Sequence, residues 1–597
     1  MGRLKERSAF SETPERNPVN LPRFFAELKR RNVYKLAVAY IVAGWALSQG
    51  IAQVFPVFDI PNWVIRLIVL LTIIGFPVAL ALAWAFELTP EGLKRTEDVD
   101  LAAQPRAKSR AWIYIAVVGA VLSIGLFFLG RFTVSQSSKS PGKSIAVLPF
   151  VDMSQGKDQE YFCDGISEEI LDTLAKVEGL RVVARTSSFS FKGKSADVTE
   201  VATKLNVANV LEGSLRRNGN RIRVSAQLIA RDGFHLWSET YDRQLQDVFA
   251  MQDEITRAIV DALKIKLALA PTIPAAHDTE AHDFYLQGLY FANKSDEESL
   301  RRALVCFQHA LDKEPTSARA WIGIAATWSW LADAYVKPLE AYPAVKAAAL
   351  KAISLDERSA GAHCYLGLAV MILDWNFAGN DAELRRALQI EPNSSLAHFM
   401  RGLLRTSEGD YDEAIAHLRN AEKSDPLSPA ISSALCTAYL RKGLIDEAVA
   451  EARRSQQVDP NYIYHDPVMG LIYRETGQYD QALAVYMKAE EVTHSPSAGL
   501  AITYARMGRK EDSCRVLNQL LKKARTGYVE ENMIASIYVA LGENDEAFRW
   551  LERAYVEHSG GLYDIAFDPD FAAIRSDPRC ADLLHRINFQ PAQKLVR

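Results

Sequence analysis

Between positions 395 and 494 the sequence repeats itself every 34 residues, and this period constrains the fold more than any other feature. Each period places small residues in both halves, and proline closes the first two periods. The positions that carry the pattern are Gly402, Ala414, Ala421, Pro426, Tyr439, Ala448, Pro460, Gly470, Tyr473, Ala482 and Ala489. Small residues let two antiparallel helices approach closely, and proline stops a helix from continuing. The pattern predicts a series of helical hairpins, with a generic helical bundle as the alternative.

A single hairpin cannot bury its own apolar face, so the hairpins are expected to stack on one another. Less regular units flank the regular ones, and about eight units fit between residues 280 and 590. The stretch from Asp568 to Ile587 is expected to cover the last apolar face as a terminal cap. This layout resembles the tetratricopeptide repeat, and the resemblance implies an all-α solenoid with a concave groove that binds peptides or partner helices.

Four polar residues on the first helices of these units are the candidate groove residues: His398, Arg401, Arg405 and Asp466. A solvated helix face is the alternative interpretation for each of them. The predicted partners are therefore proteins or peptides, and association with further copies of the chain stays open.

Three apolar runs precede the repeats, at residues 33–55, 63–86 and 111–132. Each has roughly 20 residues or more, which is enough for a helix to cross a hydrocarbon core about 30 Å thick. The sequence predicts a transmembrane hairpin over 33–86 and a third transmembrane helix over 111–132, so that the lipid bilayer is a partner. A buried soluble hairpin is the alternative.

Charge predicts the orientation of these helices. The tail over residues 1–32 and the loop over residues 87–110 are both rich in lysine and arginine, whereas few cations follow residue 132. By the positive-inside rule, the tail and the loop are expected to be cytoplasmic. Three crossings then place the residues after 132 in the periplasm of a bacterium, with the protein in the inner membrane.

A small α/β domain is expected over residues 143–269. The apolar run from Ser144 to Phe150 is typical of a buried strand. Polar and apolar residues alternate from Arg221 to Ile229, after the turn sequence Asn218-Gly219-Asn220, which predicts a β-hairpin with one solvated face. The predicted fold class is therefore multidomain: transmembrane helices, an α/β domain and a helical solenoid.

The α/β domain also carries a resemblance. The segments Ser144-Ile-Ala-Val-Leu-Pro-Phe150, Tyr161-Phe-x-Asp164-Gly-Ile-x-Glu-Glu169-Ile and Leu211-Glu-Gly213-Ser-Leu-Arg216 resemble a TolB amino-terminal-like domain. The resemblance implies a bacterial envelope or signalling protein in which this domain stands between transmembrane helices and tetratricopeptide repeats. Relatives often carry an adenylate cyclase or winged-helix domain at the cytoplasmic end. The 32 residues before the first apolar run are too few for either.

No motif in the sequence predicts catalysis. Gly193-Lys194-Ser195 lacks the glycine five residues earlier that a phosphate-binding loop needs, because Ser188 stands there. His235 has no second histidine or cysteine at metal-ligand spacing, and Cys163 has no base that could activate it. We therefore expect no enzyme activity, catalytic residue, cofactor or metal. The net charge of −4 argues against nucleic acid as a partner.

The sequence supports two hypotheses about function, from different classes of protein. The first is a non-enzymatic, membrane-anchored scaffold that presents the repeat groove and the TolB-like domain to partner proteins. The alternative is a sensor of the cyclase-related type, which would signal through a cytoplasmic effector supplied by another chain. A weaker interpretation makes the α/β domain a ligand-binding module.

Overall fold

The computed structural model divides the chain into two compact units, Met1–Lys139 and Ser140–Arg597. In the second unit it describes residues 143–590, apart from 264–277, 459–464 and the single positions 178 and 295. In the first unit it describes only scattered positions between 40 and 95, so the tail over 1–32 and the run over 111–132 lie outside the described residues.

Described residues of the first two apolar runs contact one another in the first unit. Tyr40 and Gly44 lie in helical backbone, as do Thr72, Gly75 and Phe76. The Tyr40 hydroxyl donates to the carbonyl oxygen of Thr72 at 2.9 Å, and its ring lies 5.5 Å from the ring of Phe76. The rest of the predicted hairpin over 33–86 lies outside the described residues.

A short hairpin stands where the sequence predicts a cytoplasmic loop. Strand β1 (Phe86–Thr89) pairs antiparallel with β2 (Gly92–Arg95). The remaining residues of the predicted loop, 90, 91 and 96–110, lie outside the described residues.

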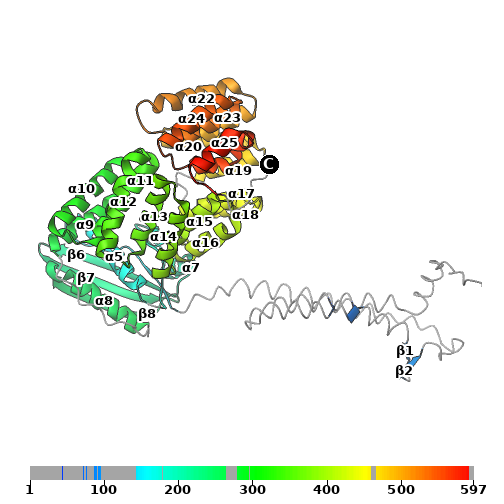
Figure 1. Ribbon diagram of the computed structural model, residues 1–597. Coiled ribbons are helices and arrows are strands. Elements are labelled where there is room, and N and C mark those ends of the chain that lie inside the picture. The colour runs from blue at the N-terminus through cyan, green and yellow to red at the C-terminus, as the bar shows by residue number, and fades with distance from the viewer. Residues whose placement is uncertain are drawn as a thin grey trace, which may run out of the picture. The chain divides into compact units, whose positions relative to one another are not determined.

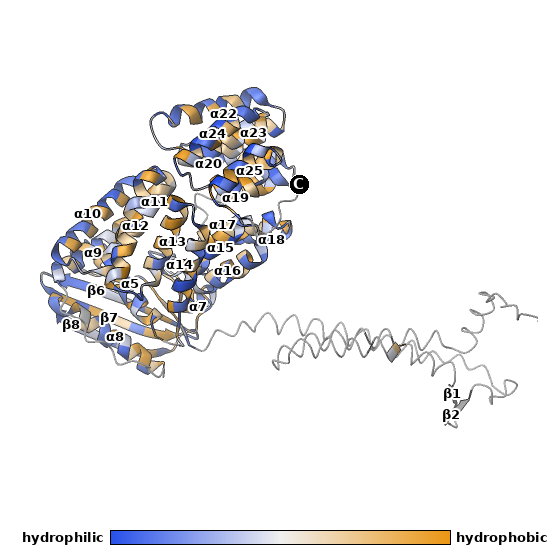
Figure 2. Cartoon of the chain, in the orientation of Figure 1, coloured by the Kyte–Doolittle hydropathy of each residue, from blue (hydrophilic) through white to orange (hydrophobic). Residues whose placement is uncertain are grey.

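The predicted location is wrong for the described part of the chain. None of the described helices is both long enough and apolar enough to cross a membrane, so an inner-membrane protein with a periplasmic second unit has no support. The physical reason is that the described helices are amphipathic: hydrophilic and hydrophobic residues alternate along them (Figure 2). Such helices bury one stripe against a neighbour rather than all faces in lipid.

The second unit begins with a mixed β-sheet. Its strands are β3 (Ser144–Val147), β4 (Val151–Asp152), β5 (Arg181–Val182), β6 (Asn209–Asn218), β7 (Arg221–Ala230) and β8 (His235–Gln244). The order is β5-β3-β6-β7-β8, with β4 beside β6. Strand β3 runs parallel to its two neighbours, whereas β6, β7 and β8 are antiparallel, so the expected hairpin forms at Gly219, which has a positive φ of 59°.

Helices cover both faces of this sheet. Helices α5 (Glu160–Ala175) and α8 (Val248–Ala262) bury Ile166, Ile170 and Met251 against the sheet residues of the larger core. Helices α6 (Arg185–Phe189) and α7 (Val198–Lys204) stand between β5 and β6, and α7 packs in a smaller core with Ala146 and Val210. A 3₁₀ turn, η2 (Leu245–Asp247), leads into α8.

The repeats follow as eight successive helix pairs over the described residues between 278 and 590 (Figure 1). Their helices are α9 (Thr279–Ala292), α10 (Glu297–Lys313), α11 (Ala318–Ala334), α12 (Pro338–Leu355), α13 (Ala360–Asp374), α14 (Phe377–Ile390), α15 (Ser395–Ser407), α16 (Tyr411–Ser424), α17 (Pro429–Arg441), α18 (Ile445–Val458), α19 (His465–Glu475), α20 (Tyr479–Thr493), α21 (Ala498–Arg506), α22 (Lys510–Lys523), α23 (Glu531–Leu541) and α24 (Asn544–Val556). The chain then forms two 3₁₀ turns, η3 (Leu562–Ala566) and η4 (Pro569–Ile574), and the short helix α25 (Pro578–Arg586).

The small residues of the 34-residue period lie at the seams between paired helices. A Cβ atom on Gly402 would stand 2.6 Å from Leu418, and one on Gly470 would stand 2.5 Å from the ring of Tyr486. The alanines at positions 414, 421, 448, 482 and 489 are all buried. Tyr439 is also buried, Tyr473 packs against the neighbouring core, and Pro460 lies outside the described residues.

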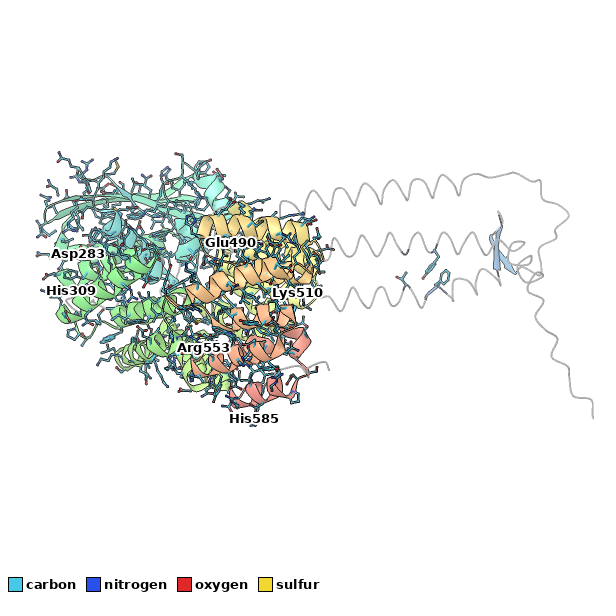
Figure 3. The ribbon with its side chains drawn as sticks, turned by 90° about the horizontal axis from the view of Figure 1, so that it is seen from above. Asp283, His309, Glu490, Lys510, Arg553 and His585 are labelled. Atoms are coloured by element: carbon cyan, nitrogen blue, oxygen red, sulfur yellow. The ribbon has the colours of Figure 1, made fainter. Side chains whose placement is uncertain are left out.

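The α/β domain docks on the repeats at two separate places. At the first, α5 packs on α9, where Tyr161 donates to Asp283 at 2.9 Å, and Arg319 of α11 donates to the buried Glu169 at 2.9 Å. Figure 3 labels Asp283. At the second, Ser187 of α6 donates its backbone N–H to Asp425, which follows α16, at 3.0 Å. The two attachments therefore lie on different repeats of the array.

Gly165 makes the first attachment sensitive to side-chain volume. A Cβ atom there would stand 2.5 Å from Cδ2 and 2.9 Å from Cγ of the fully buried Leu286. We expect Gly165→Ala to lower the free energy of unfolding by about 1–3 kcal/mol, as overpacked cores do. Gly361→Ala is the matched control on α13, because its nearest atom would be 3.7 Å away. Urea denaturation measures both, and equal effects of the two substitutions would contradict this account.

Glu168 of α5 makes stability depend on pH. Burial raises the pKa of its carboxyl group from about 4.5 to about 7, against the attraction of Arg185, which donates to it at 2.7 Å. Between these two pH values the folded chain binds more protons at this site than the unfolded chain does. Stability is therefore lost as the pH rises through this window.

We expect Glu168→Gln to lose less stability than the wild type when urea denaturation is repeated from about pH 4.5 to about pH 8. Glu200→Gln, on the exposed part of α7, is the control and should follow the wild type. Parallel curves for Glu168→Gln and the wild type would exclude this role for Glu168.

Candidate peptide-binding groove

A cavity of about 400 Å³ opens between the first helices of two successive repeats, α15 and α17. Phe399, Leu403 and Thr406 follow one another at helical spacing on α15, so they share one face of that helix. Leu403 is 41% exposed. The residues that line the cavity are Phe399, Leu403, Thr406, Ser407, Ala430, Ser433, Ala434, Thr437, Arg441, Tyr563 and Asp564. The cavity therefore combines an open apolar wall with a charged end.

The charged end belongs to a segment that comes from the far end of the sequence. We call residues 562–574, which comprise η3 and η4, the acidic segment, because they carry Asp564, Asp568 and Asp570. Arg441, the last residue of α17, donates to Asp564 and to Asp568 at 3.1 Å each. The segment thus lies against a repeat that precedes it by more than 120 residues.

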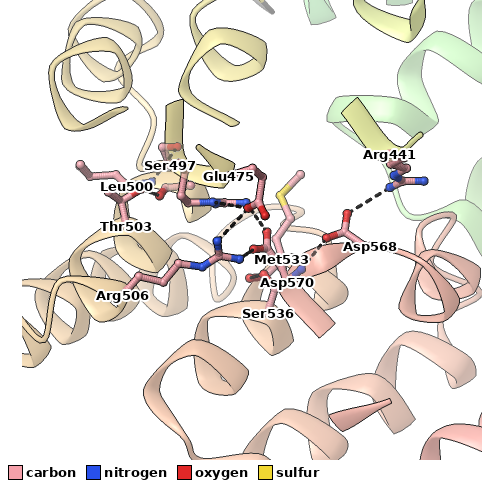
Figure 4. A network of polar contacts seen from close by, with 12 residues as sticks. Arg441, Glu475, Ser497, Leu500, Thr503, Arg506, Met533, Ser536, Asp568 and Asp570 are labelled. Carbon is pink, nitrogen blue, oxygen red and sulfur yellow. Dashed lines mark hydrogen bonds and ion pairs between the residues drawn. The ribbon is translucent and has the colours of Figure 1, made fainter. Parts of the chain in front are cut away.

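Two further arginines continue the same contact. Arg474, next to the end of α19, donates to Asp570 at 2.6 Å, and Arg506, at the end of α21, donates to the other oxygen of that carboxylate at 2.8 Å. Glu475 accepts from Arg506 at 2.8 Å and joins the network (Figure 4). Three successive repeats therefore each present one arginine to the acidic segment. We call Arg441, Arg474 and Arg506 the arginine ladder.

Burial of these charges sets the electrostatics. The side chain of Arg474 is 2% exposed and that of Asp570 is 12% exposed. Burial raises the pKa of Asp570, and the attraction of Arg474 and Arg506 does not fully offset it. Burial likewise raises the pKa of Asp564 against the attraction of Arg441. The ion pairs therefore recover only part of the cost of removing the charges from water.

Aromatic side chains of the acidic segment also contact earlier repeats. The ring of Phe567 lies against Gly409, where a Cβ atom would stand 2.6 Å from it, and it meets the ring of Tyr411 edge-on at 6.4 Å. Tyr563 meets Phe377 edge-on at 5.5 Å. The segment is thus anchored by aromatic contacts with α14 and with the turn before α16, and by ion pairs with later repeats.

The structure places the predicted groove residues in contacts within the array. His398 and His417 lie 2.9 Å apart through their Nδ1 atoms. Arg401 and Arg405 both donate to Asp381 of α14, at 3.0 and 2.7 Å. The side chain of Asp466 lies outside the described residues. As partner contacts all four stay predictions.

The pKa shifts of Asp381 and His417 are consistent with contacts of α15 within the array. Burial raises the pKa of Asp381, but Arg405 and Arg401 outweigh that effect and hold it below the ordinary value. Burial, with the nearby charge of Arg401, lowers the pKa of His417 to about 4. His417 is therefore neutral at physiological pH, and the pair with His398 is held without a buried cation.

Sequence reasoning did not single out Phe399 and Leu403, although a signal for them was present. Their positions lie one or two residues from His398 and Arg401, and each step along a helix turns the side chain by about 100°. That signal is a leucine directly after Gly402, because a residue next to a seam position turns away from the seam.

The motifs that suggested chemistry do not assemble into a site. Gly193 stands in a turn with a φ of 70°, after α6 and before the loop to α7, so no strand leads into it. Burial raises the pKa of Cys163 to about 12, which leaves its thiol protonated. Among the described residues, no group of three or more His, Cys, Asp or Glu side chains could hold a metal ion.

Comparison with known families identifies parts of the chain. Models of the tetratricopeptide repeat match residues 405–466 and 468–493. Residues 141–262 match the model of the second domain of HilA/YgeH-like transcriptional regulators. The C-terminal region therefore consists of tetratricopeptide repeats, and it follows a domain related to those regulators. That this domain is specifically similar to the TolB amino-terminal domain stays a proposal.

One curated relative is similar over a short stretch. It is named putative adenylate cyclase 3, from Rhizobium meliloti (strain 1021), and it is 58% identical over 125 residues. That stretch covers 21% of this chain and 21% of the relative, so the chain spans about a fifth of the length of the curated relative it matches.

Two solved structures are similar to part of the chain. A tetratricopeptide-repeat protein of Thermus thermophilus is 21% identical, with a TM-score of 0.28, and the match covers 32% of this chain and 98% of that one. Yeast Tom70 is 20% identical, with a TM-score of 0.34, and the match covers 57% of this chain and 77% of that one.

Gly409 tests the contact between the repeats and the acidic segment. Gly409 and Gly443 occupy the same position in successive repeats, with φ values of 80° and 83°, but a Cβ atom on Gly443 would meet nothing within 4 Å. Alanine at either position carries a left-handed strain of about 1–2 kcal/mol. We expect Gly409→Ala to lose further stability and to speed hydrogen exchange in residues 562–574. If both variants exchange alike there, the contact with Phe567 contributes nothing.

Proposed function

We propose that this protein is a non-enzymatic scaffold that holds a segment of a partner protein against the first helices of its repeats. Tetratricopeptide repeats suggest protein–protein interaction, and their first helices form the surface on which peptides bind. The observation that carries the proposal is the cavity between α15 and α17, where the apolar Leu403 is 41% exposed beside the polar Ser433 and Thr437.

The chemistry of the cavity indicates how a segment would bind. Phe399 and Leu403 offer an apolar wall for one anchoring side chain, while the hydroxyl groups of Thr406, Ser433 and Thr437 offer hydrogen bonds to a backbone. An aliphatic or aromatic anchor flanked by extended backbone fits this combination. We propose that residues 143–269 and 280–590 act as the two domains of the scaffold.

A second candidate is a sensor or signalling protein whose effector is another chain. The relative named putative adenylate cyclase 3 favours it, because the two proteins share a stretch of 125 residues that is 58% identical. In this interpretation the α/β domain, which we propose to be TolB-like, receives the signal. The two-point attachment of that domain to the repeats would transmit it.

A peptide-display selection on the full chain tests the groove. We expect the enriched peptides to bind the wild type and to lose at least about tenfold in affinity for Leu403→Glu, because the carboxylate would have to enter the apolar wall. Met487→Glu is the matched control, since Met487 is 48% exposed on α20, the second helix of its repeat. Peptides that bind Leu403→Glu as well as the wild type would exclude this groove.

A further inference from the structure

The α/β sheet ends at β8 with an uncovered edge. Strand β8 is last in the strand order, and within the described part of the chain no further strand pairs with it (Figure 1). Residues 235–240 are exposed apart from the half-buried Trp237. Leu236 is 47% exposed, and Phe234, just before the strand, is 71% exposed. An edge of this kind is a template for pairing with another strand.

The sequence of β8 lacks the usual protection of an edge. Proteins often shield an edge with lysine or proline, or by keeping the strand short. Strand β8 has 10 residues and contains neither lysine nor proline. Its charged residues, Glu239, Asp242 and Arg243, carry both signs. They therefore select among partner strands by charge rather than repel every strand.

Backbone groups along this edge point outward at every second residue. Leu245, directly after β8, donates its N–H to the carbonyl oxygen of Asn220 at 2.8 Å, across the β7–β8 pair. Residues of an antiparallel ladder alternate between the two neighbours, and the pairing with β7 is regular over residues 238–244. The N–H and C=O groups that face away from β7 are therefore those of residues 238, 240, 242 and 244. The carbonyl oxygen of Asp242 accepts from the guanidinium group of Arg243 at 3.2 Å, so this row accepts hydrogen bonds from outside the β7–β8 ladder.

The strand is complementary in charge to a second copy of itself. When two copies of β8 run antiparallel about Tyr241, residues 238–244 of both align, and Glu239 of each stands opposite Arg243 of the other. Both side chains lie on the face of the sheet that carries Tyr241, because each is two residues from it. Opposite charges directly across two strands stabilise the pair, and like charges destabilise it. Pairing centred on Glu239 or on Asp242 would instead set that residue against its own copy.

The present partner of Arg243 does not prevent this pairing. Arg243 donates to Glu254 of α8 at 2.9 Å, and the two side chains are 40% and 39% exposed. An ion pair in contact with water contributes little to stability. A guanidinium group also has five N–H donors, so Arg243 can hold Glu254 and a second carboxylate together.

We propose that two copies of this chain pair antiparallel along β8 about a two-fold axis at Tyr241, so that two α/β domains share one continuous sheet. The interface is the same strand in both copies, as two-fold symmetry requires. A pair of chains would hold two repeat arrays, so a partner with two binding segments would bind more tightly than a partner with one. The repeat groove itself does not depend on the pairing.

Sedimentation velocity on the full chain tests the backbone contacts. Thr240→Pro removes an outward N–H group, which an edge strand tolerates. Thr240→Ala is the matched control, because both substitutions remove the hydroxyl contact with Ser225 at 2.9 Å and alanine keeps the N–H group. We expect the wild type and Thr240→Ala to sediment as dimers, and Thr240→Pro to dimerise at least about tenfold more weakly, since each copy loses a hydrogen bond. A wild type with the mass of one chain, or a Thr240→Pro variant that dimerises as the wild type does, would overturn the proposal.

Disulfide trapping tests the register even if Thr240→Pro does not fold. In the proposed pair, residue 238 of one copy lies opposite residue 244 of the other, with Cα atoms about 5.5 Å apart, within the range of a disulfide. We expect the double variant Ser238→Cys/Gln244→Cys to form covalent dimers under mild oxidation. The two single variants are the controls, because two copies of either position would lie about 20 Å apart. No covalent dimer from the double variant, or equal amounts from a single variant, would exclude this pairing.

Discussion

A helical hairpin has more apolar surface than it can bury by itself, and this constraint organises the second unit. Each repeat covers the next, so the first and last members of the array and its inner surface need other cover. The α/β domain supplies it at the first repeats, where Leu286 of α9 packs against Gly165. The chain after α24 supplies it elsewhere, because Leu562, Ile565 and Phe571 share one core with residues of α10 to α15.

Two kinds of contact therefore hold the C-terminal part in place. Apolar packing joins its η3 and η4 turns and α25 to the early repeats, while the arginine ladder joins the acidic segment to the later ones. The first kind is strong and indifferent to sequence detail. The second is weaker in net free energy but selective for charge and spacing. Apolar packing and ion pairing thus involve different side chains of one short stretch.

The sequence predicted those elements of the fold that follow from local periodicity. The 34-residue spacing indicated paired helices, and alternation around Asn218-Gly219-Asn220 indicated the β6–β7 hairpin. It did not predict the cavity wall at Leu403, because neighbouring positions on a helix face different surroundings. Nor did it place the acidic segment, since the pairing of Arg441 with Asp564 spans 123 residues and leaves no local pattern. The expected membrane location is contradicted by the described helices, none of which is long and apolar enough to span a membrane.

The two attachments of the α/β domain have a mechanical meaning. A stack of repeats ordinarily stretches and twists like a spring, because each unit contacts only its neighbours. Here the bonds of Glu169 with Arg319 and of Ser187 with Asp425 tie α11 and the α16–α17 turn to helices α5 and α6 of one α/β domain. Two attachments to one domain oppose changes in the spacing of the repeats between them. From α17 onward the arginine ladder has a comparable role, because the acidic segment bridges α17, α19 and α21.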